Sequence, residues 1–162
     1  MKYKIFHVIN CASRDIPDHF RSIGIRYLEF DWSDEENEII LDEKDKNLSE
    51  IELFISTARQ KPENVLITSV NGKCRSCTVA IAYLMKKYQA LLLIFNDLTE
   101  NARYKLTLFE AIQFLGNKKP DLQLRKSFLD QLAQLERRLF PLERSLRPVK
   151  WIGADSLLSS KA

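Results

Sequence analysis

Short apolar runs alternate along the chain with longer segments of helical periodicity. The runs Ile5–Asn10 (IFHVIN), Ile25–Phe30 (IRYLEF) and Val65–Ser69 (VLITS) are rich in β-branched or aromatic residues and are bounded by polar or turn-forming residues. Such runs are typical of buried strands. Because helical patterns lie between and after them, the sequence predicts an α/β fold with a mainly parallel central sheet flanked by helices.

Two helices are predicted on either side of the third run. Apolar residues recur at steps of three and four over 48–58 and again over about 75–88, as they do on one face of an α-helix. The recurring residues are Leu48, Ile51, Ile55 and Ala58 in the first segment, and Val79, Ala82, Tyr83 and Met85 in the second.

Two more helices are predicted in the C-terminal half. The pattern Thr107-x-x-Glu110 is a capping box, which predicts a helix that runs to about Leu115 and stops at Gly116. The segment Leu122–Leu139 then repeats apolar residues on one face and ends before a proline. These apolar residues are Leu124, Phe128, Leu132, Leu135 and Leu139.

Length and composition favour one globular domain. The 162 residues are 45% hydrophobic and 29% charged, which is ordinary for a soluble domain. We assign this domain to residues 1–140 and a basic tail to residues 141–162. The longest apolar run, Ala90–Phe95, is far too short to span a membrane, and three cysteines without a framework spacing indicate a reducing compartment. We therefore expect a cytoplasmic protein without a membrane partner.

Charge is distributed unevenly along the chain. The segment Asp31–Glu50 contains nine acidic and two basic side chains, so it carries a net charge of −7 while the rest of the chain carries +10. The tail interleaves Arg144, Arg147 and Lys150 with Trp151, which suits contact with an acidic surface. No recognised nucleic-acid-binding module accompanies it, so we expect no nucleic-acid partner.

An eight-residue turn, residues 69–76, joins the third predicted strand to a predicted helix. A tight loop at this place aims backbone N–H groups at one point, where the helix dipole adds positive charge, and Arg75 can add a guanidinium fork for phosphate oxygens. The other interpretation is a plain strand-to-helix turn with a solvated Arg75. The candidate phosphate-binding residues are Ser69, Val70, Asn71, Gly72, Lys73, Cys74, Arg75 and Ser76.

This loop resembles the signature H-C-x-x-G-x-x-R-[ST] of the dual-specificity branch of the cysteine-dependent protein phosphatases. In the same register Gly72, Arg75 and Ser76 match, whereas Thr68 stands at the histidine and Ser69 at the nucleophilic cysteine. The segments HVIN, VAIAYLMKKY and LTLFEAIQFLGNKKP also look like family landmarks.

The resemblance covers about residues 5–139 and implies the family's fold, with the sheet centred on Val65–Ser69. The family usually has another strand and helix before HVIN, so the domain is expected to be N-terminally shortened and to leave a sheet edge or face open to partners. The segment Gln89–Lys105 looks like an insertion, which either extends the preceding helix or docks on another chain.

The departures from the signature bear on chemistry. In such a phosphatase the cysteine thiolate attacks phosphorus, whereas a serine hydroxyl holds its proton far more tightly and has no adjacent base in this loop. No other cysteine is followed by an arginine at the required spacing. Asp34, with Asp31 as second choice, matches the family's general acid and is interpreted as vestigial. The resemblance implies no metal and no cofactor.

We therefore interpret the chain as an inactive pseudophosphatase that serves as a scaffold or interaction subunit. Its partners would be other protein subunits, including a phosphoprotein, and scaffold-type relatives imply a cytoskeletal or ciliary assembly. The alternative is an active phosphatase, or a substrate trap engineered by one substitution, although Thr68 argues against the trap. Cys74 and Cys77 could form a redox or metal pair, but Cys77 fits better as a small packing residue.

Overall fold

The central sheet has three parallel strands in the order β2-β1-β3. A computed structural model describes residues 3–95 and 106–141, with the backbone alone for 89–95. The strands are β1 (Ile5–Asn10), β2 (Arg26–Glu29) and β3 (Asn64–Thr68). The predicted parallel α/β fold is confirmed, and each strand lies within one residue of its predicted position.

The middle strand is β1, which pairs with both of its neighbours. Val8 lies opposite Tyr27 on β2 and opposite Leu66 on β3. The prediction that the sheet is centred on Val65–Ser69 is therefore wrong, because β3 is an edge strand within the described part of the chain. The burial pattern agrees, since the last four residues of β1 are buried whereas β3 carries no buried residue.

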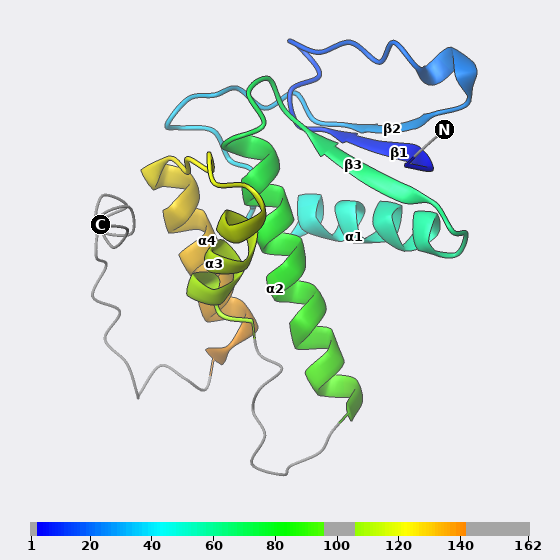
Figure 1. Cartoon of the computed structure of the whole chain (residues 1–162). Coiled ribbons are helices and arrows are strands. Elements are labelled where there is room, and N and C mark those ends of the chain that lie inside the picture. Colours follow the sequence, from blue (N-terminus) through cyan, green and yellow to red (C-terminus); the bar gives the residue numbers. More distant parts are fainter. Residues whose placement is uncertain (1–2, 96–105, 142–162) are drawn as a thin grey trace.

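Four helices lie on one side of the sheet, the first between β2 and β3 in the sequence and the other three after β3 (Figure 1). They are α1 (Lys46–Arg59), α2 (Arg75–Phe95), α3 (Leu108–Lys118) and α4 (Lys126–Leu139), and a short 3-10 helix η1 spans Arg21–Ile23. Helices α1 and α2 contact the sheet, and α3 and α4 pack against α2. No helix in residues 3–95 and 106–141 is long and apolar enough to cross a membrane.

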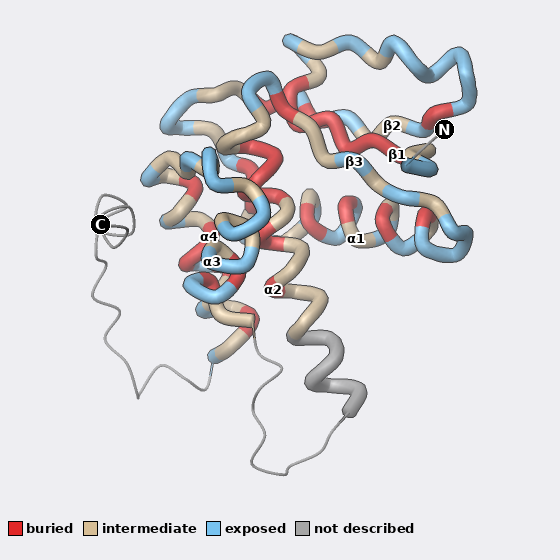
Figure 2. The backbone as a smooth tube through the Cα atoms, viewed as in Figure 1, coloured by how far each residue is buried: buried red, intermediate tan, exposed pale blue. Residues whose placement is uncertain are grey.

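The core lies between the sheet and these helices, where the predicted apolar faces converge (Figure 2). Ile9 of β1 joins a cluster with the buried faces of α1, α2 and α4. Phe30 and Trp32 belong to the same cluster, and their rings stack with centroids 4.1 Å apart. Twelve of the thirteen predicted helical positions of α1, α2 and α4 belong to this cluster or pack against it: Leu48, Ile51, Ile55, Val79, Ala82, Tyr83, Met85, Leu124, Phe128, Leu132, Leu135 and Leu139. The remaining one, Ala58, is also fully buried.

Two helix ends differ from prediction. Helix α3 continues through Gly116 to Lys118, since the amide of Lys119 still reaches the carbonyl of Leu115. Helix α4 begins at Lys126 rather than Leu122, because the preceding residues make contacts with the loop after β3. The first part of the Gln89–Lys105 insertion extends α2 to Phe95, whereas residues 96–105 and the tail after 141 lie outside the described residues.

The sheet face opposite α1 carries an apolar groove of about 490 Å³. It lies between the sheet and the β1–β2 connection, with Val8, Phe20 and Leu66 among its lining residues, and Leu66 is 44% exposed. The prediction that an open face recruits partners stays a prediction.

Candidate functional site

The loop between β3 and α2 forms one wall of a pocket. We call residues 69–74 the pocket loop. The amide of Gly72 donates to the Ser69 carbonyl at 3.1 Å, and Gly72 has a φ of +63°, a left-handed conformation that glycine adopts without strain. Helix α2 begins directly afterwards, with the Thr78 amide donating to the Cys74 carbonyl. The loop thus turns the chain at the N-terminus of α2, as the sequence predicts.

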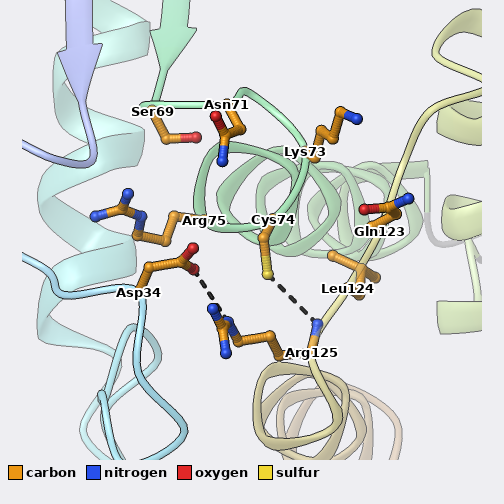
Figure 3. Close-up of a pocket in the computed structure, with 9 residues that line it drawn as sticks. All are labelled: Asp34, Ser69, Asn71, Lys73, Cys74, Arg75, Gln123, Leu124 and Arg125. Atoms are coloured by element: carbon orange, nitrogen blue, oxygen red, sulfur yellow. Dashed lines mark hydrogen bonds and ion pairs between the residues drawn. The ribbon is translucent and has the colours of Figure 1, made fainter.

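The pocket has a volume of about 330 Å³ and draws its lining from three parts of the chain (Figure 3). Asp34 comes from the segment after β2, and a third group precedes α4. The lining residues are Asp34, Ser69, Asn71, Lys73, Cys74, Arg75, Gln123, Leu124 and Arg125. Of the predicted phosphate-binding residues, Val70, Gly72 and Ser76 belong to the loop or helix but do not line the pocket.

Ser69 is buried at the end of β3, and its hydroxyl is engaged. It donates to the Ser76 hydroxyl at 3.0 Å and accepts from the Ser76 amide at 3.4 Å. Neither histidine lines the pocket: His7 is buried beside Phe54 and Glu63, and His19 lines the apolar groove. Within the described residues, Ser69 therefore has no hydrogen-bonded general base.

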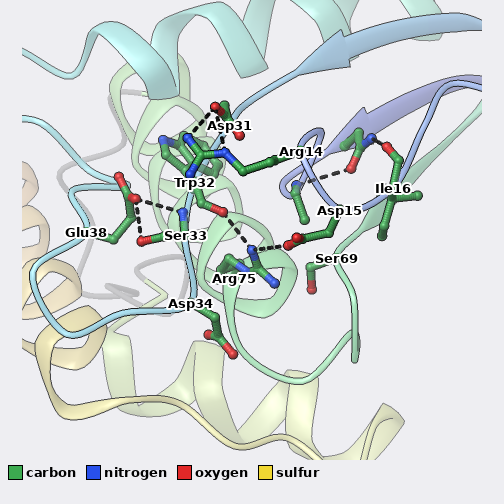
Figure 4. A network of polar contacts seen from close by, with 12 residues as sticks. Arg14, Asp15, Ile16, Asp31, Trp32, Ser33, Asp34, Glu38, Ser69 and Arg75 are labelled. Atoms are coloured by element: carbon green, nitrogen blue, oxygen red, sulfur yellow. Dashed lines mark hydrogen bonds and ion pairs between the residues drawn. The ribbon is translucent and has the colours of Figure 1, made fainter.

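Arg75 is only 4% exposed, and contacts outside the pocket loop hold it in place (Figure 4). Its Nη1 donates to the Trp32 carbonyl at 2.6 Å and lies 3.5 Å from the Asp15 carboxylate, which belongs to the loop after β1. The guanidinium is thereby fixed at the end of the sheet where loops after β1, β2 and β3 meet. Ligands of open α/β sheets bind at this end of parallel strands.

Asp34 lies in the pocket but is paired with a cation. The Arg125 Nε donates to Asp34 Oδ1 at 3.1 Å. This hydrogen bond, with the charges of Arg125 and Arg75, outweighs desolvation and holds the pKa of Asp34 below its ordinary value. A general acid must carry a proton at working pH, so this environment favours the wrong protonation state for that role.

Arg125 was not anticipated from sequence, nor were its neighbours Gln123 and Leu124. The Gln123 amide donates to the Lys73 carbonyl at 3.1 Å, and the Arg125 amide approaches the Cys74 sulfur at 3.4 Å. This segment therefore lies along the pocket loop instead of starting α4. The only local signal is an arginine just before a helix, which does not indicate the tertiary contact.

Cys74 at the end of the pocket loop and Cys77 in the first turn of α2 are free thiols, the first half-buried and the second buried. Cys77 donates to the Gly72 carbonyl at 3.2 Å, which fits its predicted packing role. Burial raises the pKa of both Cys74 and Cys77, opposite to the shift that activates redox thiols. Among the residues that the structure describes, no three His, Cys, Asp or Glu side chains converge as metal ligands.

Several acidic side chains of the segment Asp31–Glu50 are tied to neighbouring groups. Asp31 pairs with Arg14, Asp45 pairs with Arg138, and Glu38 accepts from the amide and hydroxyl of Ser33. Asp34 is the acidic residue of this segment that lines the pocket. This segment therefore contributes one carboxylate to the pocket lining, and that carboxylate is paired with Arg125.

Comparisons with solved structures find the same fold in other proteins. The human tyrosine phosphatase-like serine/threonine/tyrosine-interacting protein superposes with a TM-score of 0.63 at 23% identity, covering 85% of this chain and 80% of that one. Human DUSP28 superposes with a TM-score of 0.64 at 22% identity, covering 85% and 78%. At these identities the superpositions show the fold alone.

Sequence relatives extend the comparison. Dual specificity protein phosphatase 1 of Arabidopsis thaliana is 27% identical over 141 residues, covering 85% of this chain and 58% of that protein. Human dual specificity protein phosphatase 7 is 31% identical over 142 residues, covering 85% and 28%. The chain thus spans less than two thirds of the length of either relative. Residues 1–95 match the family described as dual specificity phosphatase, catalytic domain, and the chain therefore belongs to that family.

Proposed function

We propose that this domain is catalytically inactive and binds the phosphoryl group of a protein partner without hydrolysing it. The observation that carries the proposal is Ser69, which stands at the nucleophile position with its hydroxyl hydrogen-bonded to the hydroxyl and amide of Ser76. Neither partner can accept the proton that an attacking serine must lose. The ionised state favoured for Asp34 supports the same conclusion, because a leaving group needs a proton from that position.

Different atoms would bind the phosphoryl group and hydrolyse it. The pocket loop presents backbone groups at the N-terminus of α2, and Arg75 is anchored by the Trp32 carbonyl and not by the residue at position 69. Exchange of a thiolate for a neutral hydroxyl also removes one negative charge from the site. These features support retention of oxyanion binding when turnover is lost.

The proposed partners are other protein subunits, one of them phosphorylated, in a cytoplasmic assembly of cytoskeletal or ciliary type. A phosphoprotein ligand follows from the proposed pocket chemistry. The type of assembly follows from scaffold-type relatives and awaits affinity purification of the tagged chain with mass spectrometry.

The test combines turnover with binding. Hydrolysis of an aryl phosphate is measured for wild type, Ser69→Ala and a heat-inactivated blank, and phosphate binding is followed by chemical-shift titration of wild type and Arg75→Lys. We expect no turnover in wild type, saturable phosphate binding, and binding at least about tenfold weaker in Arg75→Lys, since a lysine cannot reproduce the guanidinium fork. Turnover that disappears in Ser69→Ala would establish the alternative, an active phosphatase.

A further inference from the structure

We propose that Arg125 is a second anion-binding residue, held in reserve by Asp34. In this inference, which rests on the proposed phosphate pocket, the Asp34–Arg125 ion pair is a latch that a ligand phosphoryl group opens by taking the place of the Asp34 carboxylate. The proposal concerns a residue outside the phosphatase signature, on a segment more than 45 residues after the pocket loop.

The first support is the fixed position of the Arg125 backbone. Gln123 and Arg125 are tied to Lys73 and Cys74 of the pocket loop by contacts of 3.1 and 3.4 Å, and α4 starts at the next residue. The base of the side chain is therefore held at the pocket whether or not Asp34 is present. The guanidinium needs only a side-chain rotation to change partner.

The second support is the way in which Asp34 is held. Within the described residues its hydrogen bond comes from a single side chain, the Arg125 Nε, and the two side chains are 38% and 37% exposed. By contrast, the nearby Asp42 accepts from three backbone amides, so its position is fixed by the fold. Solvent-accessible ion pairs such as Asp34–Arg125 are weak and readily exchanged.

The third support is the inventory of charges and donors. Lys73, Arg75 and Arg125 line the pocket together with one carboxylate, Asp34. Arg125 uses one of its five N–H donors on Asp34, and the guanidinium geometry suits two oxygens of a phosphoryl group. A dianionic ligand would thus draw Arg125 toward Arg75 and push Asp34 toward solvent.

The latch predicts opposite effects of its two members on affinity. Asp34→Asn removes the competing charge and frees the guanidinium, so inorganic phosphate should bind severalfold more tightly. Arg125→Gln removes a hydrogen-bond donor and leaves the Asp34 carboxylate without its cation, so the affinity for phosphate should fall by about tenfold or more. Arg137→Gln, at an exposed site of α4, also removes one positive charge and should leave affinity nearly unchanged.

The decisive comparison is Asp34→Asn against Asp34→Asn/Arg125→Gln, titrated with inorganic phosphate and with phenyl phosphate at constant ionic strength. The first variant has no ion pair to break, so any further loss on removing Arg125 reports its own contact with the ligand. We expect a loss of about tenfold. Equal affinity of these two variants would show that Arg125 only positions Asp34 and would overturn the latch.

The same titrations separate the latch from the pocket. If wild type binds phosphate and Arg75→Lys binds it more weakly, the pocket stands even when the Arg125 comparison shows no difference. If none of the proteins binds phosphate saturably at millimolar concentration, the pocket and the latch both fall. Unchanged backbone chemical shifts away from the pocket serve as the control for folding.

Discussion

Gln131 on α4 fixes the acidic segment that carries Asp34, and its removal should destabilise the domain. Its Oε1 accepts from the amides of Ile40 and Leu41, both at 3.0 Å, and its Nε2 donates to the Glu38 carbonyl at 2.8 Å. One side chain therefore satisfies three backbone groups that lie 90 to 93 positions earlier in the chain. Ile40 and Leu41 are 0% and 6% exposed, so water replaces these bonds poorly.

The expected effect of Gln131→Leu follows from those contacts. Each buried amide left without a partner costs about 1–3 kcal/mol, so we expect a loss of about 2–4 kcal/mol in the free energy of unfolding. For a domain of this size that is a fall of about 1–3 M in the urea midpoint, measured by circular dichroism. Gln131→Glu, which keeps the acceptor oxygens, should lose less.

Gln134→Leu supplies the matched control, because Gln134 is exposed on the same helix. Its effect should remain within about 0.5 kcal/mol of wild type. If Gln131→Leu and Gln134→Leu unfold at the same urea concentration, the three contacts contribute nothing net to stability and the reasoning is refuted.

Two further predictions concern stability. Burial, which outweighs the attraction of Glu63, holds the pKa of His7 below its ordinary value, so the unfolded chain takes up a proton that the folded chain resists. The free energy of unfolding should therefore be highest above about pH 6.5 and should fall as the pH decreases through that value. Thermal melts at pH 7.5 and 5.5 should show a smaller difference in melting temperature for His7→Phe than for wild type. An equal difference in the two proteins would contradict this cause. Thr107 caps α3 by accepting from the Glu110 amide while its own amide donates to the Glu110 carboxylate, so Thr107→Ala should lower stability by about 0.5–2 kcal/mol and Thr107→Ser much less, as measured by urea unfolding.

The elements that sequence predicts well are those that local chemistry determines. The apolar residues of α1, α2 and α4 repeat at helical spacing, and the structure buries them as expected. The capping box of α3 is a local four-residue pattern, and the structure forms it. The order of the strands is not local information. Both β1 and β3 are apolar runs, and only the pairing of β1 with two neighbours makes it the centre.

The same distinction between local and tertiary information applies to the pocket. The pocket loop follows from a strand, a glycine at a turn and a helix start, all of which are contiguous in sequence. Arg125 lines the pocket because its segment contacts Lys73 and Cys74 and does not form the first turn expected for α4. The spacing of Leu124 and Phe128 in the sequence suggests a continuous helix instead. A leucine that fits a helical face can thus line a pocket when the backbone of the residues on either side of it makes contacts elsewhere.

The contacts around Arg75 and Asp34 separate binding from proton transfer. Arg75 owes its position to the Trp32 carbonyl and to Asp15, and neither contact involves the side chain at position 69. The position of Arg75 therefore does not depend on whether residue 69 is a serine or a cysteine. Asp34, in contrast, is turned toward Arg125, which stabilises the carboxylate and opposes the protonated form. A Ser69→Cys substitution would thus supply a nucleophile without supplying an acid, so the proposed lack of turnover rests on two positions and should not be reversed by a change at one of them.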